Sequence, residues 1–350
     1  MKKTICKIIL LTPMLIALSS CNEEIDDRKT FRVSKDKDFV VLNFADIQID
    51  DPIGFEYSIG YQTIKKAIEQ EKPDIITLSG DQAWGGHTNG CYGVMCQQLD
   101  KFEIPYFFVF GNHDREFTNA YQLIDYIESS KFGYIEEGPK ELNSFGNYRI
   151  DIKNKKNKIV HSLLMMDSRN KTTFEESDYT YVNEEIPGMH YYKHNDKAIY
   201  GSENWDGVRE GQIDWYSSQI SEIDGAKSTV IMHAPTVEFS YAAELYYKAV
   251  NEYGLETANQ MYNAQGKNTE AVSSPAKDFR LFSKAKELGS TKNFIVGHDH
   301  NNCLSVNYQG IQLTYGVKCG DGAFWVEDGS MSGCTKLSIN YDGDTKISQI

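Results

Sequence analysis

The run FVVLNFAD, residues 39–46, decides the fold, because it is apolar almost throughout and ends in a carboxylate. An apolar run without alternation is typical of a strand covered on both faces, as in a parallel sheet between helices. Similar runs follow at residues 74–79 and 105–110. Segments with apolar residues at helical spacing follow each of these strands, at 55–72, 92–102 and 117–130. This alternation of strand and helix predicts an α/β fold with a parallel sheet.

The second half of the chain resumes this alternation after a hairpin. We predict the hairpin at residues 147–153 and 158–166, where the polar turn NKKN joins its strands. The next predicted elements are a helix at 209–222, a strand at 228–233, helices at 237–250 and 276–288, a strand at 293–297 and antiparallel strands within 303–341. Two polar, weakly periodic segments near 168–208 and 251–275 are predicted insertions. We therefore expect a single domain over residues 39–350.

The composition is that of an ordinary globular protein, with 350 residues of which 40% are apolar and 25% charged. The formal net charge of −14 at pH 7 argues against polyanionic nucleic acid as the main partner. Neither a GxxxxGK phosphate loop nor a GxSxG nucleophile elbow occurs in the chain. A nucleotide-driven motor and a covalent serine hydrolase therefore find no support.

The first residues have the pattern of an export signal, in which three lysines precede an apolar run at residues 8–18. The run ends in LSSC, which resembles a bacterial lipobox and would place a lipid on Cys21 after removal of residues 1–20. A plain secretory signal or a short anchor is the alternative. Residues 21–38 are highly charged and are predicted to form a flexible tether. We expect an exported lipoprotein, held on the periplasmic or surface side of a bacterial membrane.

Five cysteines remain after Cys6 and Cys21 are set aside: Cys91, Cys96, Cys303, Cys319 and Cys334. Export permits disulfides, but an odd number without CxxC or zinc-type spacing defines no disulfide framework. We interpret these cysteines as core residues and leave one disulfide open.

Polar side chains that can bind metals follow the predicted strands at the points where the strands end. They are Asp46, Asp81, Asn112 with His113 and Asp114, His233, and His298 with His300. Carboxyl ends of strands in an open α/β sheet converge on one crevice, so these side chains are expected to meet there. Carboxylate, amide and imidazole together suit Mn, Fe or Zn better than Ca or Mg. The sequence therefore predicts a transition-metal centre.

At these residues the chain resembles the calcineurin-like metallophosphoesterase superfamily, whose signature is DxH, GDxx, GNH[DE], a lone histidine after a strand, and GHxH. The resemblance covers residues 39–341, and GNHD and GHDH are its most specific parts. GNY at 146–148, MDS at 166–168 and the GDGAFW segment place it nearest the purple-acid-phosphatase-like bacterial and fungal branch. The resemblance implies a four-layer αββα sandwich of two mixed β-sheets flanked by helices.

It also implies a centre of two divalent or trivalent ions (Mn, Fe or Zn). Asp81 would bridge both ions, Asp46 and His300 would complete one side, and Asn112, His233 and His298 would hold the other. His113 would stand over the site and protonate the leaving oxygen or clamp the phosphoryl group. Asp114 would orient His113, since a carboxylate fixes an imidazole tautomer and favours its protonated form.

One position departs from the superfamily pattern. In FADIQID, residues 44–50, Gln48 stands where most members have histidine. The purple acid phosphatases also lack that histidine but carry a tyrosinate three positions after the bridging aspartate, where this chain has Trp84. Gln48 could still bind metal weakly through its amide oxygen, or hold a metal-bound water. We expect a looser, more exchangeable ion on that side.

The function expected from the sequence is metal-dependent hydrolysis of a small-molecule phosphate ester, with a phosphomonoester as the first choice. A phosphodiesterase or nucleotidase of the same fold is an alternative, and so is a binding lipoprotein that lost catalysis. Arg115 and Arg169 are further candidates for contacts with phosphate oxygens. His161 lies mid-strand and is interpreted as structural.

Overall fold

The computed structural model describes residues 27–170, 205–275, 277–321 and 332–350, together with three short strands between residues 181 and 199. The predicted export signal and Cys21 lie outside the described residues, as does most of the predicted insertion at 168–208. Among the helices that are described, none combines the length and the apolar character needed to cross a membrane.

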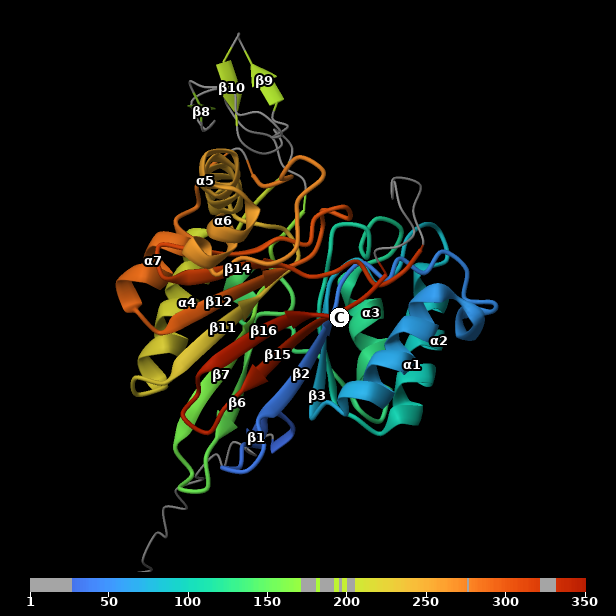
Figure 1. Ribbon diagram of the computed structural model, residues 1–350. Helices are drawn as coiled ribbons and strands as arrows, with labels where there is room; N and C mark the ends of the chain where they lie inside the picture. Colours follow the sequence, from blue (N-terminus) through green and yellow to red (C-terminus); the bar gives the residue numbers. More distant parts are fainter. Residues whose placement is uncertain are drawn as a thin grey trace, which may run out of the picture.

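A six-stranded sheet is formed mainly by the first third of the chain (Figure 1). Its strand order is β16-β15-β2-β3-β4-β5. The parallel strands are β2 (Phe39–Phe44), β3 (Ile75–Ser79), β4 (Tyr106–Val109) and β5 (Gly133–Tyr134). The strands β15 (Thr335–Ile339) and β16 (Thr345–Gln349) continue the sheet in antiparallel fashion. The helices α1 (Ile59–Glu71), α2 (Thr88–Leu99) and α3 (Ala120–Glu128) cover its outer face (Figure 1).

A seven-stranded sheet packs against the first, with the strand order β1-β6-β7-β11-β12-β14-β13. Its strands are β1 (Thr30–Arg32), β6 (Tyr148–Lys153), β7 (Ile159–Met165), β11 (Lys227–Ile231), β12 (Thr291–Val296), β13 (Ser305–Tyr308) and β14 (Ile311–Tyr315). The pairs β6–β7 and β13–β14 are antiparallel, whereas β7, β11, β12 and β14 run parallel. The helices on the outer side are α4 (Glu210–Glu222), α5 (Glu238–Tyr253), α6 (Leu255–Tyr262) and α7 (Leu281–Leu288). The predicted sandwich of two mixed sheets between helices is confirmed.

Smaller elements complete the described part of the chain. Short 3-10 helices lie at Asp27–Lys29, Phe55–Tyr57, Asp100–Phe102 and Lys140–Leu142. A separate three-stranded sheet has the order β8-β10-β9, with β8 at Tyr181–Val182, β9 at Tyr192–His194 and β10 at Lys197–Ile199. The helix predicted at 55–72 is interrupted at Ser58, because the Ser58 hydroxyl accepts a hydrogen bond from the Tyr61 N–H and so caps the start of α1.

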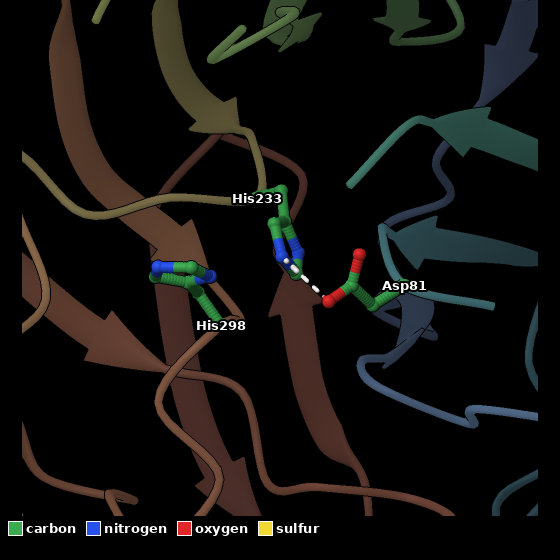
Figure 2. Close-up of side chains that lie close together, drawn as sticks. All are labelled: Asp81, His233 and His298. Carbon is green, nitrogen blue, oxygen red and sulfur yellow. Dashed lines mark ion pairs between the residues drawn. The ribbon is translucent and has the colours of Figure 1, made fainter. Parts of the chain in front are cut away.

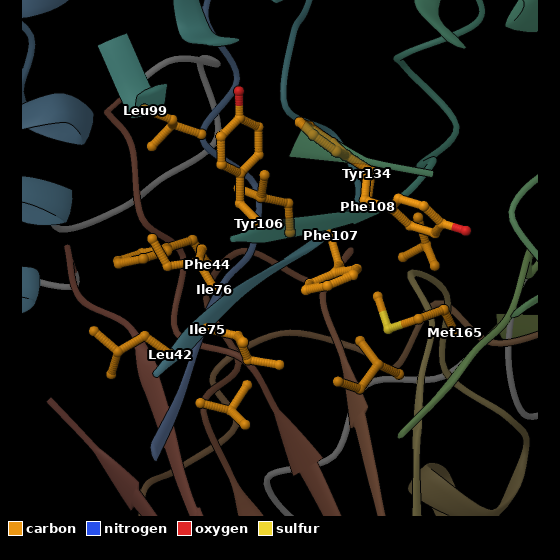
Figure 3. Packing of buried hydrophobic residues seen from close by; sticks show 14 of the residues in the cluster. Leu42, Phe44, Ile75, Ile76, Leu99, Tyr106, Phe107, Phe108, Tyr134 and Met165 are labelled. Carbon is orange, nitrogen blue, oxygen red and sulfur yellow. The ribbon is translucent and has the colours of Figure 1, made fainter. Parts of the chain in front are cut away.

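The alternation of side chains along the central strands produces the layers. In β7, Leu163 and Met165 belong to the core between the sheets, whereas Leu164 belongs to the core beneath the outer helices. Residues of one strand point alternately to its two faces, so a strand covered on both faces must be apolar at successive positions. Figure 3 shows Met165 among side chains of the other sheet, including Phe107. The uninterrupted apolar runs in the sequence therefore reflect a sheet buried on both sides.

The predicted boundary between tether and domain is wrong, whereas the insertion at 251–275 stays a prediction. The predicted tether at 21–38 folds in part onto the domain, because β1 pairs in parallel with β6 and Val33 is buried. The predicted insertion at 251–275 contains α6, and its later residues bridge to Ser305 and Asn302. Both segments also bury apolar side chains, Val33 in the first and Ala258 and Val272 in the second. The five cysteines within the described part of the chain are free, four of them buried and Cys303 half-buried.

Candidate metal centre

The predicted ligands gather at one edge of the sandwich, where parallel strands of both sheets end. Asp46 follows β2, Asp81 follows β3, and Asn112 follows β4 in the six-stranded sheet. His233 follows β11, and His298 and His300 follow β12 in the seven-stranded sheet. The side chains of Asp46, Asp81, Asn112, His233 and His300 are all buried. The centre therefore lies on the seam between the two sheets.

The ligand atoms form two groups that share Asp81. In one group Asp81, His233 and His298 each place an atom within 4.8 Å of the others, and in the second group Asp46, Asp81 and His300 do the same. Figure 2 shows Asp81, His233 and His298 turned toward one another from three different strand ends. We call the first group the His233 group and the second the His300 group. A shared carboxylate between two sets of donors is the arrangement of a dinuclear centre.

Two buried ligand atoms have fewer partners than such atoms need. Among the described residues, His298 Nε2 is shielded from solvent without a hydrogen-bond partner, and the contact of the buried Asp81 Oδ2 is its ion pair with His233 Nε2 at 3.2 Å. A buried polar atom without a partner costs free energy, so such atoms are rare in folded proteins. A cation bound between them would satisfy both. The donor set and these atoms therefore fit metal ions.

His233 is held in the tautomer that a metal ligand requires. Its Nδ1 lies 3.0 Å from the carbonyl oxygen of Ser79 and donates to it. The other nitrogen, Nε2, is then left to face Asn112 Oδ1 at 3.1 Å and Asp81 Oδ2 at 3.2 Å. Such a hydrogen bond on the remote nitrogen orients a ligating imidazole.

The charges in the centre shift the pKa values of its residues strongly. Burial alone would lower the pKa of His233, but the carboxylate of Asp81 outweighs burial and raises it to about 10. Burial and the neighbouring His233 lower the pKa of His298 to about 3. Burial opposes ionisation of Asp81, yet His233 beside it holds the pKa of that carboxyl well below its usual range. At neutral pH the carboxylates are thus ionised and His298 is a neutral ring, which is the state in which they bind cations. His233 carries a proton on Nε2 that a bound cation would displace.

The backbone at the ligands is bent so that side chains approach each other closely. Asp46, Asp81 and His298 have positive φ angles of 53°, 53° and 80°, which are unfavourable for residues with a Cβ atom. Gly111 lies so close to Asp81 that a Cβ atom at Gly111 would overlap the Asp81 carboxylate. The glycine in FGNHD is therefore required by close packing against the shared ligand.

The predicted role of Gln48 is corrected by its contacts. Its amide oxygen accepts a hydrogen bond of 2.8 Å from Lys318 Nζ, and its amide nitrogen lies 3.0 Å from His300 Nε2. The oxygen that was predicted to bind metal is therefore engaged by a lysine, and the nitrogen cannot act as a ligand. Gln48 fixes the position of His300 instead.

The predicted pairing of His113 with Asp114 is also wrong. The Asp114 carboxylate is fully buried and accepts hydrogen bonds from the backbone N–H groups of Asp81, Gln82, Ala83 and Gly111. It holds the two ligand loops together. The partner of His113 is Glu116, whose Oε2 lies 3.0 Å from His113 Nδ1. His113 Nε2 lies 3.9 Å from Asp81 Oδ2, so the ring faces the centre.

The two arginines suggested as phosphate contacts serve the scaffold. Both terminal nitrogens of Arg115 bind the buried carboxylate of Asp167, at 3.1 and 3.3 Å. Arg169 donates to Gln212 Oε1 and to the carbonyl oxygen of Leu142. His161 is fully buried and bonded on both nitrogens, in agreement with its structural interpretation.

Sequence reasoning missed three residues of the site. Glu116 lies three positions after His113, so its spacing could have indicated a contact with that histidine. Lys318 lies 270 positions from Gln48, and no local sequence pattern indicates the contact between them. Trp205 is a third neighbour, with its ring centroid 4.5 Å from that of His298.

Comparison with known proteins places these features in a wider group. The sequence model described as calcineurin-like phosphoesterase matches residues 39–302. The chain is 24% identical to "Probable inactive purple acid phosphatase 14" of Arabidopsis thaliana, covering 89% of this chain and 78% of that protein. It is 22% identical to "Probable inactive purple acid phosphatase 28" of the same plant, covering 77% of this chain and 65% of the relative.

Among solved structures, the crystal structure of a dimetal phosphatase from Danio rerio resembles the chain with a TM-score of 0.52. The identity is 11%, and the superposition covers 89% of this chain and 96% of that one. At this identity the likeness concerns the fold.

Proposed function

The chain belongs to the calcineurin-like phosphoesterase family, and from that premise we propose that it is a metal-dependent phosphomonoesterase. The observation that carries the proposal is the pair of ligand groups sharing Asp81, with His113 beside them. Asp81, His233, His298 and Asn112 would hold one ion, and Asp46, Asp81 and His300 the other. When bound, paired cations supply an activated water and neutralise charge on phosphoryl oxygens.

His113 is suited to protonate the leaving oxygen. Its side chain is 17% exposed, so it lies at the entrance of the otherwise buried centre. The carboxylate of Glu116 lies 3.0 Å from Nδ1 and fixes the orientation of the ring. The opposite nitrogen, Nε2, faces the centre and would carry the proton that is transferred. A histidine in this position can transfer that proton to the departing alcohol.

A pocket next to Gln48 supports a substrate with a single phosphate. The pocket has a volume of about 240 Å³ and is lined by Ile47–Ile49, Ile53, Phe55, Ser58 and three carboxylates, Asp50, Asp51 and Asp321. The carboxylates that line the pocket repel further anionic groups, so a polyphosphate or a nucleic acid would be disfavoured there. A small alcohol or sugar portion carries no such penalty.

The test is hydrolysis of p-nitrophenyl phosphate and bis-p-nitrophenyl phosphate by the purified protein with added Mn²⁺. We expect the monoester to be the better substrate. His113→Ala should lower turnover by about 100-fold, the usual size of an acid–base contribution, and leave metal content unchanged. Glu116→Gln should lower turnover less and shift its pH profile, whereas Glu128→Gln, an exposed glutamate on α3, serves as the matched control.

Other outcomes identify the alternatives. Preference for the diester would assign a phosphodiesterase, and an unchanged rate in His113→Ala would remove His113 from the mechanism. Metal binding without turnover of either ester with Mn, Fe or Zn would assign a catalytically degenerate binding protein. The relatives named as inactive make that second function a real competitor.

A further inference from the structure

A buried lysine lies directly behind the His300 group. Lys318 is 2% exposed, and its Nζ donates to the backbone oxygen of Asp46 at 2.9 Å and to Gln48 Oε1 at 2.8 Å. A lysine is rarely buried to this degree unless specific partners hold it. Both of its partners belong to the loop that carries one ligand of the His300 group. The proposed function assigns no role to Lys318.

The contact with Lys318 decides which end of the Gln48 amide faces the ligands. An ammonium group can only donate, so the amide oxygen must point to Lys318 and the NH₂ group to the other side. That other side is His300 Nε2, 3.0 Å away. The same His300 Nε2 lies 3.5 Å from Asp46 Oδ1, so it is the nitrogen that faces the other ligands of its group. The Gln48 NH₂ therefore donates to the lone pair that a metal ion would use.

The positive charge of Lys318 also weakens metal binding in the His300 group. A cation in the His300 group would lie close to the ammonium, and charges within a protein are screened far less than charges in water. In the His233 group, by contrast, the contacts of His233 include a neutral carbonyl and a neutral amide oxygen that leave its Nε2 facing the centre. His233 receives its orienting contact from a neutral carbonyl, and Asn112 directs its amide oxygen toward His233 Nε2.

We propose that Lys318 sets the metal occupancy of the centre by turning Gln48 away from metal binding and by placing a fixed positive charge beside the His300 group. The inference rests on the proposed function only in that the centre binds metal ions. One ion is resident in the His233 group, and the ion in the His300 group is weak and exchangeable. The lysine thereby limits the resting centre to one tightly held cation.

The experiment measures Mn²⁺ binding, without any activity assay. Full-length protein is stripped with EDTA, transferred to chelator-free buffer and titrated with MnCl₂ by isothermal calorimetry, and bound manganese is counted by mass spectrometry. Unmodified protein should bind one ion tightly and a second at least about 10-fold more weakly. Lys318→Met and Lys318→Gln should each tighten the second ion by at least about 10-fold and leave the first unchanged.

Lys336→Met is the matched control, because Lys336 pairs with Glu71 on a strand away from the ligands and should have no effect on either ion. Should Lys318→Met fail to fold, Lys318→Gln still tests the idea, since glutamine keeps a donor but removes the charge. Two ions of equal affinity in the unmodified protein, or a second ion that neither variant tightens, would overturn the inference. Binding as expected without ester hydrolysis would remove the proposed function and leave this inference standing.

Discussion

Acidification is expected to destabilise the protein through His161, a histidine away from the metal centre. His161 is fully buried in β7 with Nδ1 2.9 Å from the carbonyl oxygen of Gly343 and Nε2 2.9 Å from Thr229 Oγ1. Burial lowers the pKa of His161 from 6.5 to about 4. The folded protein therefore keeps this ring neutral at pH values where the unfolded chain protonates it.

The sign and size of the effect follow from this difference. Between pH 6.5 and about 4 the unfolded chain binds more protons at His161, so the free energy of unfolding falls as the pH falls. One pKa unit corresponds to about 1.4 kcal/mol, which gives about 3 kcal/mol over the whole window. The contribution is fully present above pH 6.5 and is lost as the pH approaches 4. The free energy of unfolding of a folded domain is typically about 5–15 kcal/mol, so a loss of this size is a large share of it.

The assay is urea denaturation at several pH values between 7.5 and about 4, with EDTA present so that metal release does not contribute. The protein is compared with His161→Gln, whose amide does not titrate, and with His87→Gln as the control at an exposed position. Other titrating groups cancel in the comparison. We expect the glutamine variant to lose about 3 kcal/mol less than the unmodified protein across the window. Parallel pH dependence in the two proteins would refute the reasoning.

Three further outcomes are expected. Gly111→Ala should weaken Mn²⁺ binding by at least about 10-fold in calorimetry, because the added methyl group displaces Asp81, whereas Gly86→Ala, which meets open space, should leave binding unchanged. Adding MnCl₂ at about 100 times its dissociation constant should raise the free energy of unfolding by about 2.7 kcal/mol in a denaturant titration, and an unchanged midpoint would contradict a metal site in the folded state. Arg115→Met should lower the free energy of unfolding by about 3 kcal/mol, measured in urea, because it leaves Asp167 buried without its charge partner. A loss of activity at unchanged stability would instead indicate that Arg115 contacts the substrate.

Local sequence patterns predicted the central strands of the fold and the residues that follow them. The apolar runs at residues 39–44, 74–79 and 105–110 became β2, β3 and β4, since a strand buried on both faces must be apolar at successive positions. The polar residues after these strands lie together because parallel strands present their carboxyl ends at one edge. The charged N-terminal segment was misread at β1, where three residues pair with β6 despite their charged surroundings.

By itself, then, the sequence determined the α/β layers and the set of residues able to bind metal, because strand periodicity and strand ends are properties of neighbouring residues. The tertiary structure alone decided what each of these residues contacts. Asp114 bonds to the backbone of another loop, and Gln48 meets a lysine 270 positions away. Such contacts depend on how two sheets pack and how their loops bend, and packing joins residues whose separation along the chain leaves no periodic signal. The residue that we propose to control metal occupancy, Lys318, is therefore one that no motif contains.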